Sequence, residues 1–167
     1  MNAYELTVPV FTRLLGNLEA LLDKGAAHAE AKKFDPAVLV QARLAPDMFP
    51  LVKQVQIAAD YAKGGVARLT GAEPPKWEDT ESSLADLKAR IARTRDFVEA
   101  HAPEQFAGAL ERRIEIKIGG QPVAISGLDY LNRLVLPSFY FHLVTAYDIL
   151  RHNGVDIGKR DYLGPLP

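Results

Sequence analysis

The sequence PSFYFHLVTAYDILRHNG, residues 137–154, carries apolar side chains on more than one side of a helix. They recur at three- and four-residue spacings, which predicts a helix that neighbouring helices surround. We expect this helix to begin near Ser126, whose hydroxyl can cap the first turn, and to run to about His152. Asn153-Gly154 then supplies a left-handed cap. Pro137 lies inside the helix and should kink it.

Immediately before this helix, the pattern changes from a helical period to a period of two. Apolar and charged residues alternate strictly in residues 113–118, and a second run follows Gly119-Gly120. Two such runs around a Gly-Gly pair predict a β-hairpin with a tight turn. Pro122 places the second strand at a sheet edge, because proline cannot donate a ladder hydrogen bond.

Three further long helices are predicted upstream of the hairpin from the same three-four periodicity. With a short helix after the first, the expected spans are residues 4–25, 35–43, 47–70 and 83–102. Gly25 should end or loosen the first helix, and Asp47 should cap the second long one. Ser83 and Asp86 predict a capping box for the third. The charged outer face of that helix, which includes Arg90, is expected to be solvated.

Four long helices and one hairpin predict a mostly α protein. We expect a four-helix bundle with a small β-hairpin before the last helix, formed by a single domain over residues 1–167. The connections between the helices leave room for a crossover, so their up-and-down order stays open.

Composition excludes several classes of function. The chain has 167 residues, and 20 Lys and Arg nearly balance 21 Asp and Glu for a net charge of −1. Nucleic-acid binding and a polybasic membrane surface are therefore not expected. Cysteine is absent, so disulfides, thiolate metal sites and a cysteine nucleophile are excluded. The stretch without charges, residues 134–147, is shorter than the roughly 20 residues of a spanning helix. The N-terminus lacks an export signal, which predicts a cytoplasmic protein.

Polar residues interrupt the apolar face that the last helix is expected to turn toward its neighbours. Ser138, His142 and Thr145 lie on consecutive turns of one face, and Gln54 is available on the second long helix. Facing helices of a bundle build ligand pockets from such inward polar residues. These four residues form the candidate pocket. A lone histidine on an apolar seam is also typical of a core residue that a neighbouring polar group satisfies.

The chain resembles a known family in three stretches: residues 44–51, 137–154 and 158–164. They are similar to an uncharacterised, largely bacterial domain family (DUF family nineteen-ninety-three), which is grouped with the DinB/YfiT-like superfamily of metalloenzymes. The resemblance covers essentially the whole chain. It implies a four-helix bundle, in agreement with the periodicity.

The metal site of that superfamily typically uses one histidine of the second helix and a His-x-x-x-His pair on the last. The second helix has no histidine here, and the pair position next to His142 is filled by Ser138 on one side or Ala146 on the other. We therefore expect no metal and no other cofactor. A divalent metal, zinc or nickel, would have to bind His142 together with non-histidine ligands.

The expected function is a DinB-like bundle that binds a small molecule and whose superfamily metal site is degenerate. One alternative is a metal-dependent enzyme, a thiol S-transferase or hydrolase, that uses His142. Another is a structural or regulatory homodimer without a small-molecule site. Whichever of these functions holds, we expect the protein to form a homodimer. We expect neither nucleic acid nor a membrane as a partner. Binding requires the polar seam to open into a cavity, whereas a purely structural bundle would keep it packed.

Overall fold

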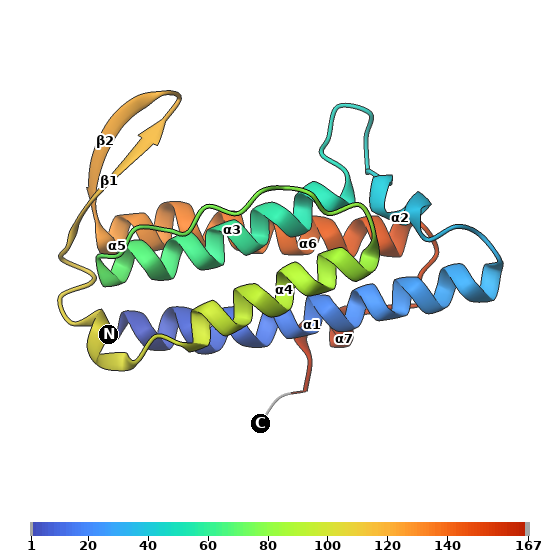
Figure 1. Ribbon diagram of the computed structural model, residues 1–167, viewed down its shortest axis with the longest axis horizontal. Coiled ribbons are helices and arrows are strands. Elements are labelled where there is room, and N and C mark those ends of the chain that lie inside the picture. Colours follow the sequence, from blue (N-terminus) through green and yellow to red (C-terminus); the bar gives the residue numbers. More distant parts are fainter. Residues whose placement is uncertain (1, 166–167) are drawn as a thin grey trace.

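Four long helices lie side by side along the long axis of the molecule (Figure 1). The computed structural model describes residues 2–165. The long helices are α1 (Ala3–Lys32), α3 (Leu51–Thr70), α4 (Leu84–Glu99) and α6 (Leu136–His152), and the short ones are α2 (Ala37–Gln41), α5 (Gly127–Tyr130) and α7 (Lys159–Leu163). A 3-10 turn, η1 (Pro103–Phe106), a π-helical turn, η2 (Leu131–Val135), and two strands, β1 (Arg113–Ile118) and β2 (Gln121–Ser126), complete the chain. The protein is thus mostly helical, with an antiparallel hairpin before the last helix, as predicted.

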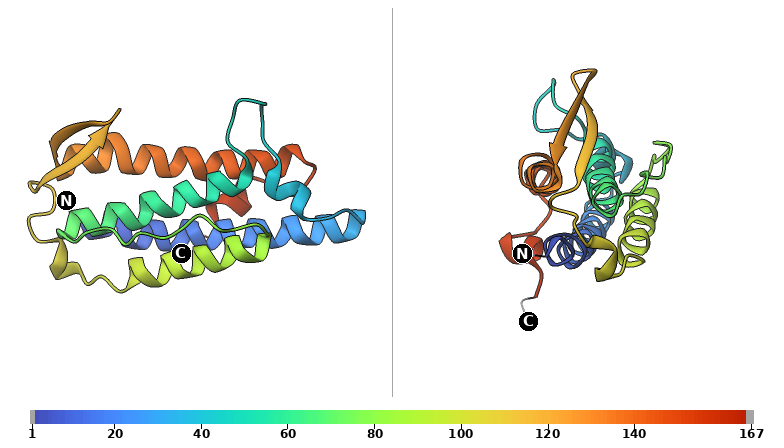
Figure 2. Two further views of the ribbon diagram at one scale, coloured as in Figure 1. Left: turned by 45° about the horizontal axis from the view of Figure 1, so that its top comes forward. Right: turned by 90° about the vertical axis from the view of Figure 1, so that its left-hand side faces the viewer.

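The connection between α3 and α4 crosses the length of the molecule. In Figure 1, α1 and α6 run from left to right, whereas α3 and α4 both run from right to left. The strap, which we define as residues 71–83, returns the chain from the end of α3 to the start of α4 (Figure 2). The crossover that the connection lengths allowed is therefore present, and it lies in this segment. α6 packs against α3, and α1 packs against α4.

The helical stripes predicted from the sequence form the core. Buried members of these stripes include Phe11, Leu15, Leu18 and Leu22 of α1 and Val55, Ala59, Ala62 and Val66 of α3. The expected end of the first helix at Gly25 is wrong, because α1 continues to Lys32. A Cβ at Gly25 would lie 3.1 Å from Cδ2 of Leu150, so the glycine permits close packing of α6 on α1.

A proline sets the start of α3, and a capping box sets the start of α4. The prediction that Asp47 caps the second long helix is wrong, because α3 begins at Leu51 after Pro50 and Asp47 is exposed. A proline disfavours helical conformation in the residue before it, so the helix does not extend back through Phe49. The predicted capping box of α4 is confirmed: the Asp86 amide donates to Oγ of Ser83.

The last helix is built in three sections. Ser126 caps α5 as predicted, and η2 and α6 continue the same rod. Pro137 has no N–H to give to the carbonyl four residues earlier, and the wider π turn lies just ahead of it. The expected irregularity at this proline therefore takes the form of a change in winding. Gly154 ends the helix at φ 88°, in the left-handed conformation that was predicted, and Val155 beyond it is buried.

The hairpin is fixed at its base by a close backbone approach. Its register places Lys117 opposite Pro122, with Gly119 and Gly120 in the turn. A Cβ at Gly127 would lie 1.8 Å from the Ala109 carbonyl oxygen, so only glycine fits where the hairpin joins α5. Within residues 2–165, no helix combines the length and the apolar character needed to cross a bilayer.

Candidate functional site

Gln54 and His142 meet across the interface between α3 and α6. The imidazole Nδ1 lies 2.7 Å from Oε1 of Gln54, and Nε2 of Gln54 donates to the Phe49 carbonyl oxygen at 2.9 Å. Because the amide group donates through Nε2, its Oε1 accepts the bond from the imidazole. Nδ1 of His142 therefore carries the proton, and Nε2 of the neutral ring keeps its lone pair.

The surroundings of His142 favour the neutral imidazole. The ring is half-buried, and this burial lowers its pKa below the ordinary value of 6.5. Tyr61 of α3 stacks on it, with ring centroids 6.1 Å apart and an angle of 16° between the planes. Phe141 contacts the ring edge-to-face. A histidine held between aromatic rings is fixed in orientation by packing as well as by its hydrogen bond.

The other two predicted pocket residues are placed differently. Thr145 is buried, and its hydroxyl donates to the Phe141 carbonyl oxygen of its own helix at 2.7 Å. That bond uses the only proton of the hydroxyl. Ser138 is half-buried one turn before His142. The structure thus joins Gln54 to His142, leaves Ser138 beside them, and commits the Thr145 proton to the backbone.

A second polar contact lies near the other end of α3, where this helix meets α5. Arg68 of α3 donates through Nη1 to the Tyr130 hydroxyl at 3.1 Å, and that hydroxyl donates to the Gly64 carbonyl oxygen at 3.3 Å. Burial raises the pKa of Tyr130, although the neighbouring Arg68 opposes this effect. One polar pair therefore joins α3 to α6 and another joins α3 to α5, with Tyr61 between them on α3.

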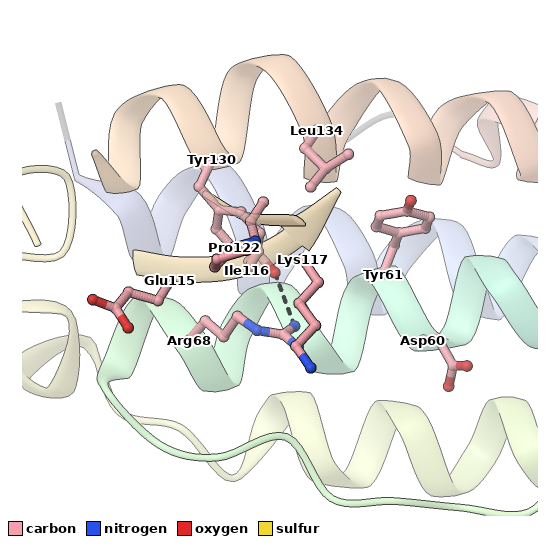
Figure 3. A pocket seen from close by; sticks show the side chains of 9 residues that line it. All are labelled: Asp60, Tyr61, Arg68, Glu115, Ile116, Lys117, Pro122, Tyr130 and Leu134. Carbon is pink, nitrogen blue, oxygen red and sulfur yellow. Dashed lines mark hydrogen bonds between the residues drawn. The ribbon is translucent and has the colours of Figure 1, made fainter. Parts of the chain in front are cut away.

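A cleft of about 580 Å³ opens between the hairpin, α3 and the α5–η2 section (Figure 3). This volume falls within the range of pockets that hold small organic ligands. The residues that line it are Asp60, Tyr61, Arg68, Glu115, Ile116, Lys117, Pro122, Tyr130 and Leu134. Tyr61 belongs both to this lining and to the stack on His142, so the cleft adjoins the predicted pocket.

The residues near His142 do not fit the metal centre that the superfamily resemblance implies. Structural and catalytic zinc sites use at least three protein ligands. Within residues 2–165, no three His, Cys, Asp or Glu side chains lie close enough together to hold a metal ion. Gln54 already uses its amide oxygen to accept from the imidazole, and amides are weak ligands for zinc-type ions.

Sequence reasoning missed three residues of this site. Tyr61, Arg68 and Tyr130 were not singled out, although Gln54, Tyr61 and Arg68 follow one another at seven-residue spacing. Seven residues make almost two helical turns, so these three polar or aromatic side chains share one face of α3. This seven-residue repeat was the signal that the sequence offered. The cleft also depends on where the hairpin folds, which no local spacing specifies.

Comparisons with known proteins agree on one family. The family model described as domain of unknown function (DUF1993) matches residues 3–163. A crystal structure of a DinB family member protein from Shewanella denitrificans is 47% identical, with a TM-score of 0.94, over 99% of this chain and 93% of that one. The curated proteins include no significant match. The chain therefore belongs to the DUF1993 family of DinB-like proteins.

Proposed function

We propose that this protein is a DinB-type four-helix bundle that binds a small organic molecule without a metal centre. The observation that carries the proposal is the cleft beneath the hairpin, lined by two tyrosines and by apolar and charged side chains. Ligand sites typically combine such an apolar wall with a few polar groups that orient the ligand. The absence of a three-ligand cluster among residues 2–165 supports a metal-independent site.

Binding is tested with N-phenyl-1-naphthylamine, a neutral two-ring probe whose fluorescence rises in apolar surroundings. Wild-type protein should bind it, and Leu134→Trp should abolish binding because the indole fills part of the cleft. Leu128→Trp is the matched control, since Leu128 is 42% exposed on α5 and lies outside the lining. Thermal melting of both variants verifies that they fold. Equal probe binding by wild type and Leu134→Trp would contradict the proposal.

The alternative of a metal-dependent enzyme, a thiol S-transferase or hydrolase, is tested by elemental analysis of the purified protein. We expect zinc and nickel far below one ion per chain, because one imidazole and one amide make a poor donor set. Calorimetric titration with each metal should give no tight binding. About one ion per chain, lost in His142→Ala, would favour the enzyme instead.

A further inference from the structure

We propose that the cleft takes an organic anion with an apolar body, held by Arg68 and Lys117. This inference rests on the proposed small-molecule function and assigns its ligand class. Two cationic side chains reach the cleft from opposite walls: Arg68 extends from α3, and Lys117 points down from the hairpin toward that helix (Figure 3). Ile116, Pro122 and Leu134 supply the apolar part of the lining.

Carboxylates do not neutralise these two cations. Within residues 2–165, neither Arg68 nor Lys117 forms an ion pair with an acidic side chain. Nη1 of Arg68 donates to the neutral Tyr130 hydroxyl and to the Gly64 carbonyl oxygen, which leaves the N–H groups of Nε and Nη2 for a ligand. A cation that a folded protein leaves without a counter-charge at a cleft attracts an anion from solution.

The two acidic residues of the lining are engaged elsewhere. Asp60 pairs with Lys63 at 2.8 Å and with Arg90 of α4 at 2.9 Å, and Figure 3 shows its carboxylate directed toward α4. Glu115 lies 3.6 Å from its neighbour Arg113 and points away from the centre of the cleft in the same view. The cations therefore face the cleft, whereas the carboxylates turn outward.

The neighbouring surface adds positive charge. Arg68 also lines a second hollow of about 380 Å³, where three arginines, Arg68, Arg112 and Arg113, outnumber the two carboxylates of Glu73 and Glu115. Clustered cations raise the local potential and the local concentration of anions. Arg68 stands between the two hollows, and it is the guanidinium that a carboxylate, sulfonate or phosphate group can engage through two parallel hydrogen bonds.

The test compares two probes that share one scaffold and differ by a single acidic group. These are 1-anilinonaphthalene-8-sulfonate and its neutral analogue N-phenyl-1-naphthylamine. Wild-type protein should bind the sulfonate more tightly, and added salt should weaken that preference. Arg68→Gln should weaken sulfonate binding about tenfold, the size of one charge-assisted hydrogen bond, while binding of the neutral probe stays unchanged. Lys117→Gln should act in the same direction by a smaller factor.

Matched variants distinguish loss of a contact to the ligand's charge from disturbance of the fold. Arg133→Gln removes a cation that is 82% exposed, paired with Asp129 and outside the cleft. This variant should bind both probes with wild-type affinity. Lys117 is exposed on the hairpin, so its variant stays informative even if Arg68→Gln disturbs Tyr130. Equal affinity for the two probes, or full sulfonate affinity in both glutamine variants, would overturn the anion assignment alone. If Leu134→Trp bound the probes as tightly as wild type does, the proposed binding function itself would be overturned.

Discussion

At the level of single residues, the pair formed by Gln54 and His142 gives the α3–α6 interface its chemical character. Gln54 fixes the proton on Nδ1 of the imidazole, and Tyr61 stacks on the ring. His142 is thereby held neutral, oriented and next to the cleft. A neutral imidazole accepts a proton or a hydrogen bond through Nε2, which is the role that remains open to it in ligand binding.

The lowered pKa of His142 predicts how this residue affects stability with pH. The folded state resists protonation of the ring, whereas the unfolded chain protonates it near the ordinary value of 6.5. The unfolded state therefore binds more protons below that pH, and His142 lowers the free energy of unfolding as the pH falls. His142→Gln should cost about 1 kcal/mol at neutral pH, for the lost hydrogen bond, and less in acid.

Urea unfolding of wild type and His142→Gln between about pH 8 and about pH 5 measures this effect. NMR titration of the imidazole gives the pKa directly, and His152→Gln assigns the spectrum by removing the resonance of an exposed ring. A midpoint at or above 6.5 for His142, or parallel pH profiles of the two proteins, would contradict the prediction.

Part of this site was predictable from the sequence, and the physical reason is local periodicity. The position of His142 on the inner seam follows from helix geometry, and Gln54 is the polar residue available on the facing helix. Tyr61 and Arg68 share a face with Gln54, but their role depends on the hairpin folding over that face. A spacing rule describes one helix, whereas the cleft requires three separate segments to meet.

At the level of elements, the strap joins α3 to α4 through a buried ionic cluster centred on Arg90. This side chain is 4% exposed, which overturns the expectation that Arg90 is solvated, whereas Arg93, Asp96 and Glu99 of the same helix are exposed as expected. Its guanidinium lies 2.9 Å from Asp60, and 3.0 Å from both Asp79 and Glu81 of the strap. The pattern of α4 alone cannot reveal that the strap covers Arg90, so the position of this one residue was mispredicted.

Removing Arg90 should destabilise the protein strongly. Arg90→Met leaves the carboxylates of the strap without their counter-charge, and we expect a loss of about 2–3 kcal/mol. This lies below the cost of a fully buried pair because Asp60 and Asp79 are partly solvated. Chemical unfolding measures the change. Arg133→Met, which breaks an exposed pair within one helix, is the control and should cost less than about 0.5 kcal/mol.

Acid should weaken the same cluster. Burial alone would raise the pKa of Glu81, but hydrogen bonds from Gln56 and Arg90 outweigh it and hold that pKa below its ordinary value. A carboxylate with a lowered pKa stabilises the fold above its unfolded pKa, and this contribution is lost as the pH falls. Stability of Arg90→Met should therefore depend less on pH in the acid range than that of wild type. An Arg90→Met variant as stable as wild type would show that the strap is held by other contacts.

At the level of the whole molecule, one side of α6 remains uncovered. Pro137, Phe141 and Val144 are exposed at successive turns of the helix, and Phe141 is 58% and Val144 40% exposed. Single exposed apolar residues are ordinary, but an aligned set on one helix is typical of an interaction surface. We propose that a second copy of the chain covers this stripe. A helix stripe can pair with itself around a two-fold axis, and a net charge of −1 gives two copies little mutual repulsion.

If the stripe forms the dimer interface, a charged residue placed on it should dissociate the dimer. Phe141→Asp places a carboxylate at the centre of the proposed contact, where both copies would have to bury it without a partner. Sedimentation equilibrium should give a dimer mass for wild type and a monomer mass for the variant. Val38→Asp is the matched control, because Val38 is also 58% exposed but lies on α2 and should leave the dimer intact. A monomeric wild type at micromolar concentration would refute the dimer, and a dimeric Phe141→Asp would place the interface elsewhere.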